Sequence, residues 1–175
     1  MFLERHGKMK IEFGGGNNPK RPNFRQVDIR KINDDTIVCN AWEIDQQVDV
    51  NCVTEIFSRH FFEHLSHDQA KRTLDSWHKI LVKGGRVEML VPNMSMHIWQ
   101  WLNWDNLTDK EKNHCRTSIW GQQREADESS WDLHKAGYDY PKLKELVEEH
   151  GFTTVRLLAR NDHEFKHLHV DFFKP

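Results

Sequence analysis

The chain has 175 residues, a length suited to one domain with a substantial hydrophobic core. Its 25 Lys and Arg residues nearly balance 27 Asp and Glu residues, so the basic excess typical of nucleic-acid-binding proteins is missing and no nucleic-acid partner is expected. Three widely spaced cysteines favour reduced thiols, and no apolar run approaches the roughly 20 residues of a membrane span, so we expect a soluble cytoplasmic protein without a membrane partner.

The first predicted element is an alternating strand over residues 9–13 that ends in three glycines, residues 14–16. Glycine tolerates positive φ and lets a ligand approach the backbone closely. Where such a turn follows the first strand of an open α/β sheet, the crevice at the end of that strand binds nucleotide-like cofactors. A second strand over residues 24–30 brings Asp28 only about a dozen positions after the glycines, so the intervening helix is expected to be very short or missing.

A β-branched run over residues 36–39 predicts a third strand, and the second half of residues 48–58 predicts a fourth. Ser66 and Gln69 have the spacing of a capping box. A helix is therefore expected over residues 68–82, with its apolar side chains at helical spacing and two glycines ending it.

The remainder of the chain is expected to add three strands and a helix. Residues 86–91 predict a fifth strand, and residues 141–150 an amphipathic helix. Residues 152–159 and 167–173 alternate as a terminal hairpin would. Between the fifth strand and this helix, residues 94–140 show weak periodicity and several tryptophans. This pattern favours an irregular or part-helical insertion acting as a lid over the active site.

Four segments together resemble class I S-adenosylmethionine-dependent methyltransferases, in a subgroup with a shortened first helix. They are Ile-Glu-Phe-Gly-Gly-Gly-Asn-Asn at 11–18, Val-Asp-Ile at 27–29, Phe-Ser-Arg-His-Phe-Phe-Glu-His-Leu at 57–65 and Ile-Leu-Val-Lys-Gly-Gly-Arg-Val at 80–87. The similarity runs from residue 10 to about residue 93, and residues 119–123 and 134–152 resemble the tail of the same subgroup.

This resemblance implies an α/β fold, a Rossmann-like three-layer sandwich with a mixed seven-stranded sheet and a C-terminal β-hairpin. It implies one methyltransferase domain over residues 1–175, with S-adenosyl-L-methionine as the cofactor. The methyl acceptor is unidentified, and relatives with this tail favour a small molecule or a sugar.

Carried over by position, the resemblance also implies a cofactor lying across the ends of the first, second and fourth strands. Asp28 would accept hydrogen bonds from the ribose hydroxyls, and Ile29 would contact the adenine. The expected cofactor-binding residues are Glu12, Gly14, Gly15, Gly16, Asn17, Asp28, Ile29, Asn40, Ala41, Trp42, Ser58, Arg59 and His60. The chain departs from the family pattern at Asn18, which replaces a glycine, and at Asn40, which replaces an acidic residue.

Methyl transfer from a sulfonium is a displacement, so alignment of the reactants contributes most of the acceleration. A general base is needed only for an acceptor that is protonated at working pH. His60 and His134 are the candidate catalytic residues, although His60 could instead only order its loop. Trp120, Gln122 and Gln123 are candidates for the acceptor site, with ordinary packing as the alternative for Trp120. No metal is assigned to this site.

Two other function classes remain open. His60 to His64 reads His-x-x-Glu-His, an inverted zinc-protease motif, and the chain has 12 histidines, as a His-rich metal hydrolase would. That motif requires both histidines to face one way from a helix, whereas His60 is expected at a strand end before Ser66. A non-catalytic cofactor- or partner-binding protein with the same fold is the second alternative.

Overall fold

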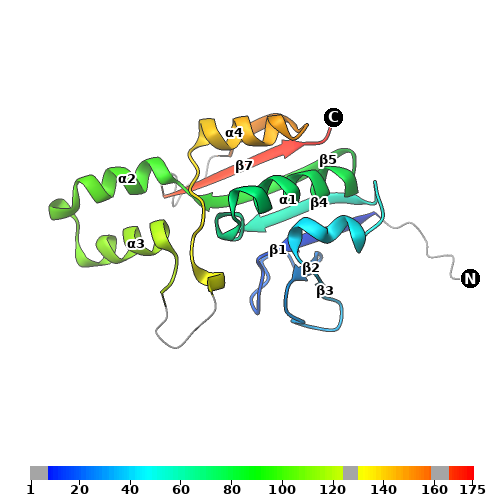
Figure 1. Cartoon of the computed structure of the whole chain (residues 1–175), viewed down its shortest axis with the longest axis horizontal. Helices are drawn as coiled ribbons and strands as arrows, with labels where there is room; N and C mark the ends of the chain where they lie inside the picture. The colour runs from blue at the N-terminus through cyan, green and yellow to red at the C-terminus, as the bar shows by residue number, and fades with distance from the viewer. Residues whose placement is uncertain (1–7, 124–129, 159–165) are drawn as a thin grey trace, which may run out of the picture.

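The computed structural model describes residues 8–123, 130–158 and 166–175 (Figure 1). Seven strands form one sheet in the order β3-β2-β1-β4-β5-β7-β6. The first five are parallel, and β7 runs antiparallel to both β5 and β6. The predicted mixed sheet and terminal hairpin are therefore confirmed. The strands are β1 Met9–Phe13, β2 Arg25–Asp28, β3 Ile37–Val38, β4 Val53–Arg59, β5 Leu81–Pro92, β6 Thr153–Leu157 and β7 His167–Phe173.

The helices connect these strands and supply one packed layer. The α-helices are α1 His67–Ile80, α2 Met94–Leu102, α3 Asp109–Trp120 and α4 Tyr140–Glu149. Short 3-10 helices are η1 Ala41–Gln46, η2 Phe62–His64, η3 Trp104–Asn106 and η4 Ser130–Asp132. No helix in the described ranges is long and apolar enough to cross a membrane.

Helix α1 begins at the predicted capping box, in which Ser66 and Gln69 exchange hydrogen bonds. Its predicted end was wrong. The helix stops at Ile80 because Leu81 is already extended (φ −66°, ψ 139°), so the two glycines fall within β5. Gly84 turns the chain there with φ +74° and donates its backbone N–H to the carbonyl of Lys174.

The core lies between the sheet and a layer formed by α1, α4 and η1 (Figure 1). The fully buried Trp77 of α1 packs against Phe13 of β1, with ring centroids 5.0 Å apart. Asp75 pairs with His150 at the end of α4, and the Ser76 hydroxyl donates to a carbonyl of η1. These contacts place the three helical elements on one face of the sheet.

The opposite face over β4, β5 and β7 is covered mainly by charged side chains and by the loop after β1. The Arg21 guanidinium lies 4.5 Å from the centre of the Phe57 ring and pairs with Glu88 at 2.7 Å. As predicted, no helix forms between β1 and β2. The third layer of the expected sandwich is therefore built here by a loop, because this connection is too short for a helix that could cover the sheet.

The region predicted as a part-helical insertion is largely helical where it is described. α2 and α3 lie side by side and project beyond the sheet (Figure 1). A capping box between Thr108 and Glu111 begins α3, a signal that the sequence analysis overlooked. Residues 124–129 of this insertion and residue 159 of the last predicted strand pair lie outside the described residues.

Candidate functional site

The parallel strands bring most of the predicted site residues to one edge of the sheet. Phe13, the last residue of β1, pairs in register with Val27 of β2 and Ser58 of β4. The glycine turn, Asp28 and the end of β4 therefore lie side by side. In open α/β sheets, ligands bind outside this edge, where the strands end.

The glycine turn fits against the segment that leaves β4. Gly14 has φ +76°, and a Cβ atom there would lie 2.6 Å from Phe61 Cβ and 2.9 Å from the Arg59 carbonyl oxygen. Only glycine allows this approach without displacing the backbone. Gly16 also has positive φ, at +49°, but with open space around it, and Asn17 is exposed on the turn.

Glu12, predicted to face the cofactor, holds the loop that follows the turn. Its buried carboxylate accepts hydrogen bonds from the backbone N–H groups of Lys20 (2.8 Å) and Arg21 (3.0 Å). A side chain at Gly15 would meet the same carboxylate at 3.2 Å. Glu12 therefore supports the turn by fixing the chain behind it.

Asp28 ends β2 at this edge, with its carboxylate partly engaged. Its Oδ1 accepts hydrogen bonds from Arg30, from the backbone N–H at 2.9 Å and from Nε at 3.3 Å. The side chain of Ile29 is 39% exposed, which leaves an apolar surface beside the carboxylate. This pair has the acceptor and the apolar wall that a ribose with an attached flat ring requires.

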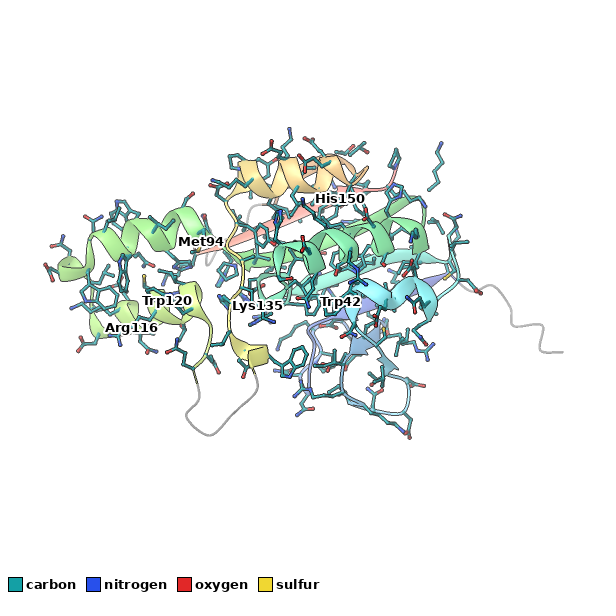
Figure 2. The ribbon with its side chains drawn as sticks, in the orientation of Figure 1. Trp42, Met94, Arg116, Trp120, Lys135 and His150 are labelled. Carbon is teal, nitrogen blue, oxygen red and sulfur yellow. The ribbon has the colours of Figure 1, made fainter. Side chains whose placement is uncertain are left out.

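Residues 40–42 form the start of η1. Asn40 Nδ2 donates to Glu43 Oε2 at 2.9 Å, and Ala41 is buried. The Trp42 ring lies 5.9 Å from the Arg72 guanidinium of α1 (Figure 2 labels Trp42). This segment is therefore tied to the helical layer, and its N-terminal end lies just beyond β3.

The end of β4 directs His60 out of the sheet. Ser58 and Arg59 are still within β4, and Ser58 is fully buried. His60 takes the left-handed region (φ 47°), and its N–H donates to the Leu90 carbonyl at 3.0 Å. Non-glycine residues in this region tend to cluster at functional sites. His60 Nδ1 lies 3.3 Å from Glu63 Oε1.

His60 and His134, the two predicted catalytic residues, line the same cavity of about 500 Å³. Its walls come from the end of β4, from η2, from α3 and from the start of β7, so segments far apart in the sequence meet here. The predicted Gln122 also lines it. The histidines in its wall are His60, His64, His114, His134 and His167.

Trp120 does not line this cavity. Its side chain is 42% exposed, and its ring lies 4.8 Å from that of Trp101 on α2. Figure 2 shows Trp120 and Arg116 on α3, to one side of the sheet. The packing interpretation of Trp120 is therefore the one that agrees with its contacts.

The imidazoles of His64 and His134 are held by backbone carbonyls. Nδ1 of His134 donates to the Ser118 carbonyl at 2.9 Å, and Nδ1 of His64 donates to the Leu133 carbonyl at 3.1 Å. Their ring centroids are 4.8 Å apart. Burial lowers the pKa of His134, and the nearby Glu63 charge only partly offsets this, so His134 is neutral at neutral pH.

Glu63 occupies the buried floor of the cavity, with its side chain 1% exposed. Its backbone carbonyl accepts the N–H groups of Lys135 (2.8 Å) and Ala136 (3.1 Å), which anchors the segment carrying His134. Burial, and then the Glu63 charge, raise the pKa of Tyr138. The backbone of Glu63 therefore holds the segment that carries His134, while its carboxylate lines the cavity.

Two further cavity residues, His114 and His167, were not predicted from the sequence. His167 begins a predicted strand, and only the pairing of β7 with the end of β5 brings its ring to 4.8 Å from that of His60. His114 lies on α3, whose orientation no sequence pattern gave. The high histidine count was the one available signal.

No family model matches the sequence, and no curated protein sequence does. Solved structures do match. A SAM-dependent methyltransferase from Archaeoglobus fulgidus is 14% identical with a TM-score of 0.63, over 96% of this chain and 86% of that one. The chain has the class I methyltransferase fold.

Other methyltransferase structures show the same fold. A possible histamine N-methyltransferase from Thermotoga maritima is 14% identical, with a TM-score of 0.61 over 99% of this chain and 84% of that one. The Burkholderia thailandensis 1,6-didemethyltoxoflavin-N1-methyltransferase, with its substrate and S-adenosylhomocysteine bound, is 14% identical, with a TM-score of 0.58 over 96% and 71%. At this identity the likeness establishes the methyltransferase fold alone.

Proposed function

We propose that this chain is an S-adenosylmethionine-dependent methyltransferase that acts on a small-molecule or sugar acceptor. The observation that carries the proposal is the meeting of three features at one edge of the sheet. These are the glycine turn after β1, the carboxylate of Asp28 at the end of β2 and the histidine-lined cavity after β4. In this proposal the strand ends hold the cofactor, and the cavity holds the acceptor beside it.

In this proposal the cofactor lies along the strand ends. The turn at residues 14–17 faces its methionine part, and Asp28 accepts hydrogen bonds from the ribose hydroxyls. Ile29 contacts the adenine, with residues 40–42 at its border. Ser58, Arg59 and His60 lie beneath the sulfonium. In this position the methyl group points toward the cavity.

The reaction is a displacement in which the acceptor atom forms a bond to the methyl carbon. The carbon–sulfur bond breaks, and its electron pair stays on sulfur, giving S-adenosylhomocysteine. For a hydroxyl acceptor, His60 or the neutral His134 takes the proton. The insertion at residues 94–140 contributes Gln122 and His134 to the cavity wall, which supports its role as a lid that keeps water from the reacting atoms.

Calorimetric titration with S-adenosylmethionine tests the cofactor assignment. We expect saturable binding, and we expect Asp28→Ala to weaken it by about 10-fold or more, because hydrogen bonds to a charged group are lost. Asp34→Ala is the matched control, since this carboxylate is almost fully exposed and pairs only with Lys31 among the described contacts. Unchanged affinity in Asp28→Ala would show that the ribose assignment is wrong.

The same titration separates the other function classes. Binding without formation of S-adenosylhomocysteine across a panel of hydroxyl and amine acceptors would favour the non-catalytic alternative. The absence of binding at millimolar cofactor would contradict the proposed function altogether.

A further inference from the structure

Three metal-ligand side chains converge on one wall of the histidine-lined cavity. They are Glu63 from η2, His64 from the same turn and His134 from the segment after η4. One possible ligand atom from each lies within 4.8 Å of those of the other two. Two imidazoles and one carboxylate are a donor set that suits zinc and other divalent transition metals.

Both imidazoles keep one nitrogen free to bind a metal. A carbonyl oxygen can only accept, so the contacts with Leu133 and Ser118 place a proton on Nδ1 of His64 and of His134. The nitrogen left with a lone pair is Nε2 in each ring. Metal-binding histidines are typically fixed in this way, with the second nitrogen donating to a carbonyl or a carboxylate.

The Glu63 carboxylate provides the second, independent observation. It is 1% exposed, and its Oε2 has no hydrogen-bond partner among the described residues. Among the described contacts, its other oxygen has only His60 Nδ1 as a partner, at 3.3 Å. Burying a carboxylate costs free energy unless it is paired or bound to a metal. The Oε2 of Glu63, unpaired within the described ranges, is therefore a ligand atom available to a metal ion.

We propose that Glu63, His64 and His134 bind a divalent transition-metal ion, best matched by Zn²⁺, with an open coordination position toward the cavity. Three protein ligands and one open position are the arrangement of catalytic zinc sites. Tetrahedral ligands about 2.1 Å from zinc lie about 3.4 Å apart, so the ion draws the three side chains closer together.

This site differs from the His-x-x-Glu-His motif considered from the sequence. His60 leaves the end of β4 before η2 begins, and it contacts the Glu63 carboxylate rather than joining the cluster. His134, more than sixty residues away in the chain, takes the third ligand position. His60 then orients the ligating carboxylate, as outer partners of metal sites do.

The role of the ion rests on the proposed function, whereas its binding does not. An acceptor hydroxyl that fills the open position loses its proton more readily, because the cation stabilises the alkoxide. Because the Nε2 lone pair of His134 is then on the metal, His60 is the base that takes that proton. The oxygen bonds to the methyl carbon, and the carbon–sulfur electron pair leaves with sulfur. The acceptor class is therefore an alcohol or a sugar hydroxyl able to coordinate a metal.

Metal binding to the purified, chelator-treated full chain tests the site. We expect one equivalent of Zn²⁺ by calorimetry, and four-coordinate ligand-field absorption when Co²⁺ replaces it. Glu63→Gln, His64→Ala and His134→Ala should each weaken Zn²⁺ binding by more than the roughly 10–100-fold typical of losing an outer partner. His150→Ala is the control, because this histidine lies at the far end of α4, paired with Asp75 (Figure 2).

Circular dichroism and a parallel titration with S-adenosylmethionine establish that each variant is folded, and Glu63→Gln keeps the shape of the buried side chain. Zn²⁺ affinity that is absent in the wild type, or unchanged in all three ligand variants, would overturn the metal site. Loss of affinity in His150→Ala would do the same. If the wild type binds S-adenosylmethionine but not Zn²⁺, the metal-site proposal is wrong and the proposed function is unaffected.

Discussion

At the scale of single residues, Gly14 permits β1 to end beside the segment that leaves β4. A methyl group at this position would meet Phe61 Cβ at 2.6 Å and a carbonyl oxygen at 2.9 Å, and the backbone is left-handed. Neither neighbour is the far end of a flexible side chain. The turn therefore depends on glycine for space as well as for φ.

Gly14→Ala should lower the free energy of unfolding by about 2 to 4 kcal/mol, combining the cost of a left-handed residue with that of overpacking. Gly16→Ala is the control, since its φ is also positive but no atom of the described residues lies within 4 Å of the added methyl. It should cost only about 1 to 2 kcal/mol. Urea denaturation measures both, and equal losses would mean that the contact with Phe61 does not matter.

Sequence patterns predicted the position of Asp28 but not the contacts of Glu12. Asp28 lies at the end of β2 as predicted, because its distance from the glycines left no room for a helix. The hydrogen bonds of Glu12 to Lys20 and Arg21 could not be predicted, since a carboxylate in a strand carries no sign of where a later loop will fold.

At the scale of elements, α1 is the helix that joins β4 to β5 and covers both. The sequence predicts its start from the capping box. It predicts its buried face from the helical spacing of four apolar residues, Ala70, Leu74, Trp77 and Ile80. Its end was mispredicted because Leu81 and Val82 continue the apolar pattern while already belonging to β5, where Leu81 pairs with Val53. A helix period and a buried strand cannot be told apart over two residues.

Ser66→Ala should lower the free energy of unfolding by about 1 kcal/mol, since the first turn of α1 loses a side-chain acceptor for the Gln69 N–H. Ser66→Asp keeps an acceptor at this position and should retain most of the stability. Thermal unfolding of the two variants beside the wild type is the measurement. Equal destabilisation by both substitutions would contradict the cap.

At the scale of the whole molecule, the sheet face away from α1 is held by ion pairs across strands. Asp171 of β7 is buried and accepts hydrogen bonds from Arg156 of β6 (2.8 Å) and Arg86 of β5 (3.0 Å). Burial alone would raise the pKa of Asp171, but the two guanidinium groups outweigh it and lower that pKa. Three strands from the C-terminal half of the sheet thus share one carboxylate.

A carboxyl group whose pKa is lower in the folded state stabilises the fold above its unfolded value, near 3.8, and loses that contribution as pH falls through the folded value. Asp171→Asn should therefore cost about 2 to 3 kcal/mol at neutral pH, because the hydrogen bonds from Arg86 and Arg156 lose their charged acceptor. The difference from the wild type should shrink below about pH 4. Urea denaturation across pH tests this, with the exposed Asp34→Asn as the control.

A stability difference between Asp171→Asn and the wild type that stays constant from neutral pH into acid would contradict the assignment. Glu88 of β5 contributes in the same direction: burial opposes its ionisation, yet His169, Arg21 and Arg86 lower its pKa. The acid sensitivity of the fold should thus persist in part when Asp171 is replaced.

The sequence by itself determined the order of the strands, the presence of α1 and α4 and the helix-free link from β1 to β2. These follow from local signals: hydrophobic period, turn residues and capping. The grouping of Gly14, Asp28 and His60 at one edge of the sheet was implied by the resemblance to methyltransferases. Only the tertiary structure decided which histidines share a cavity. The rings of His60 and His167 meet through the pairing of β5 with β7, and His134 reaches Glu63 because two backbone hydrogen bonds anchor its segment. Contacts between residues so distant in the chain depend on packing, and packing leaves no periodic trace in the sequence.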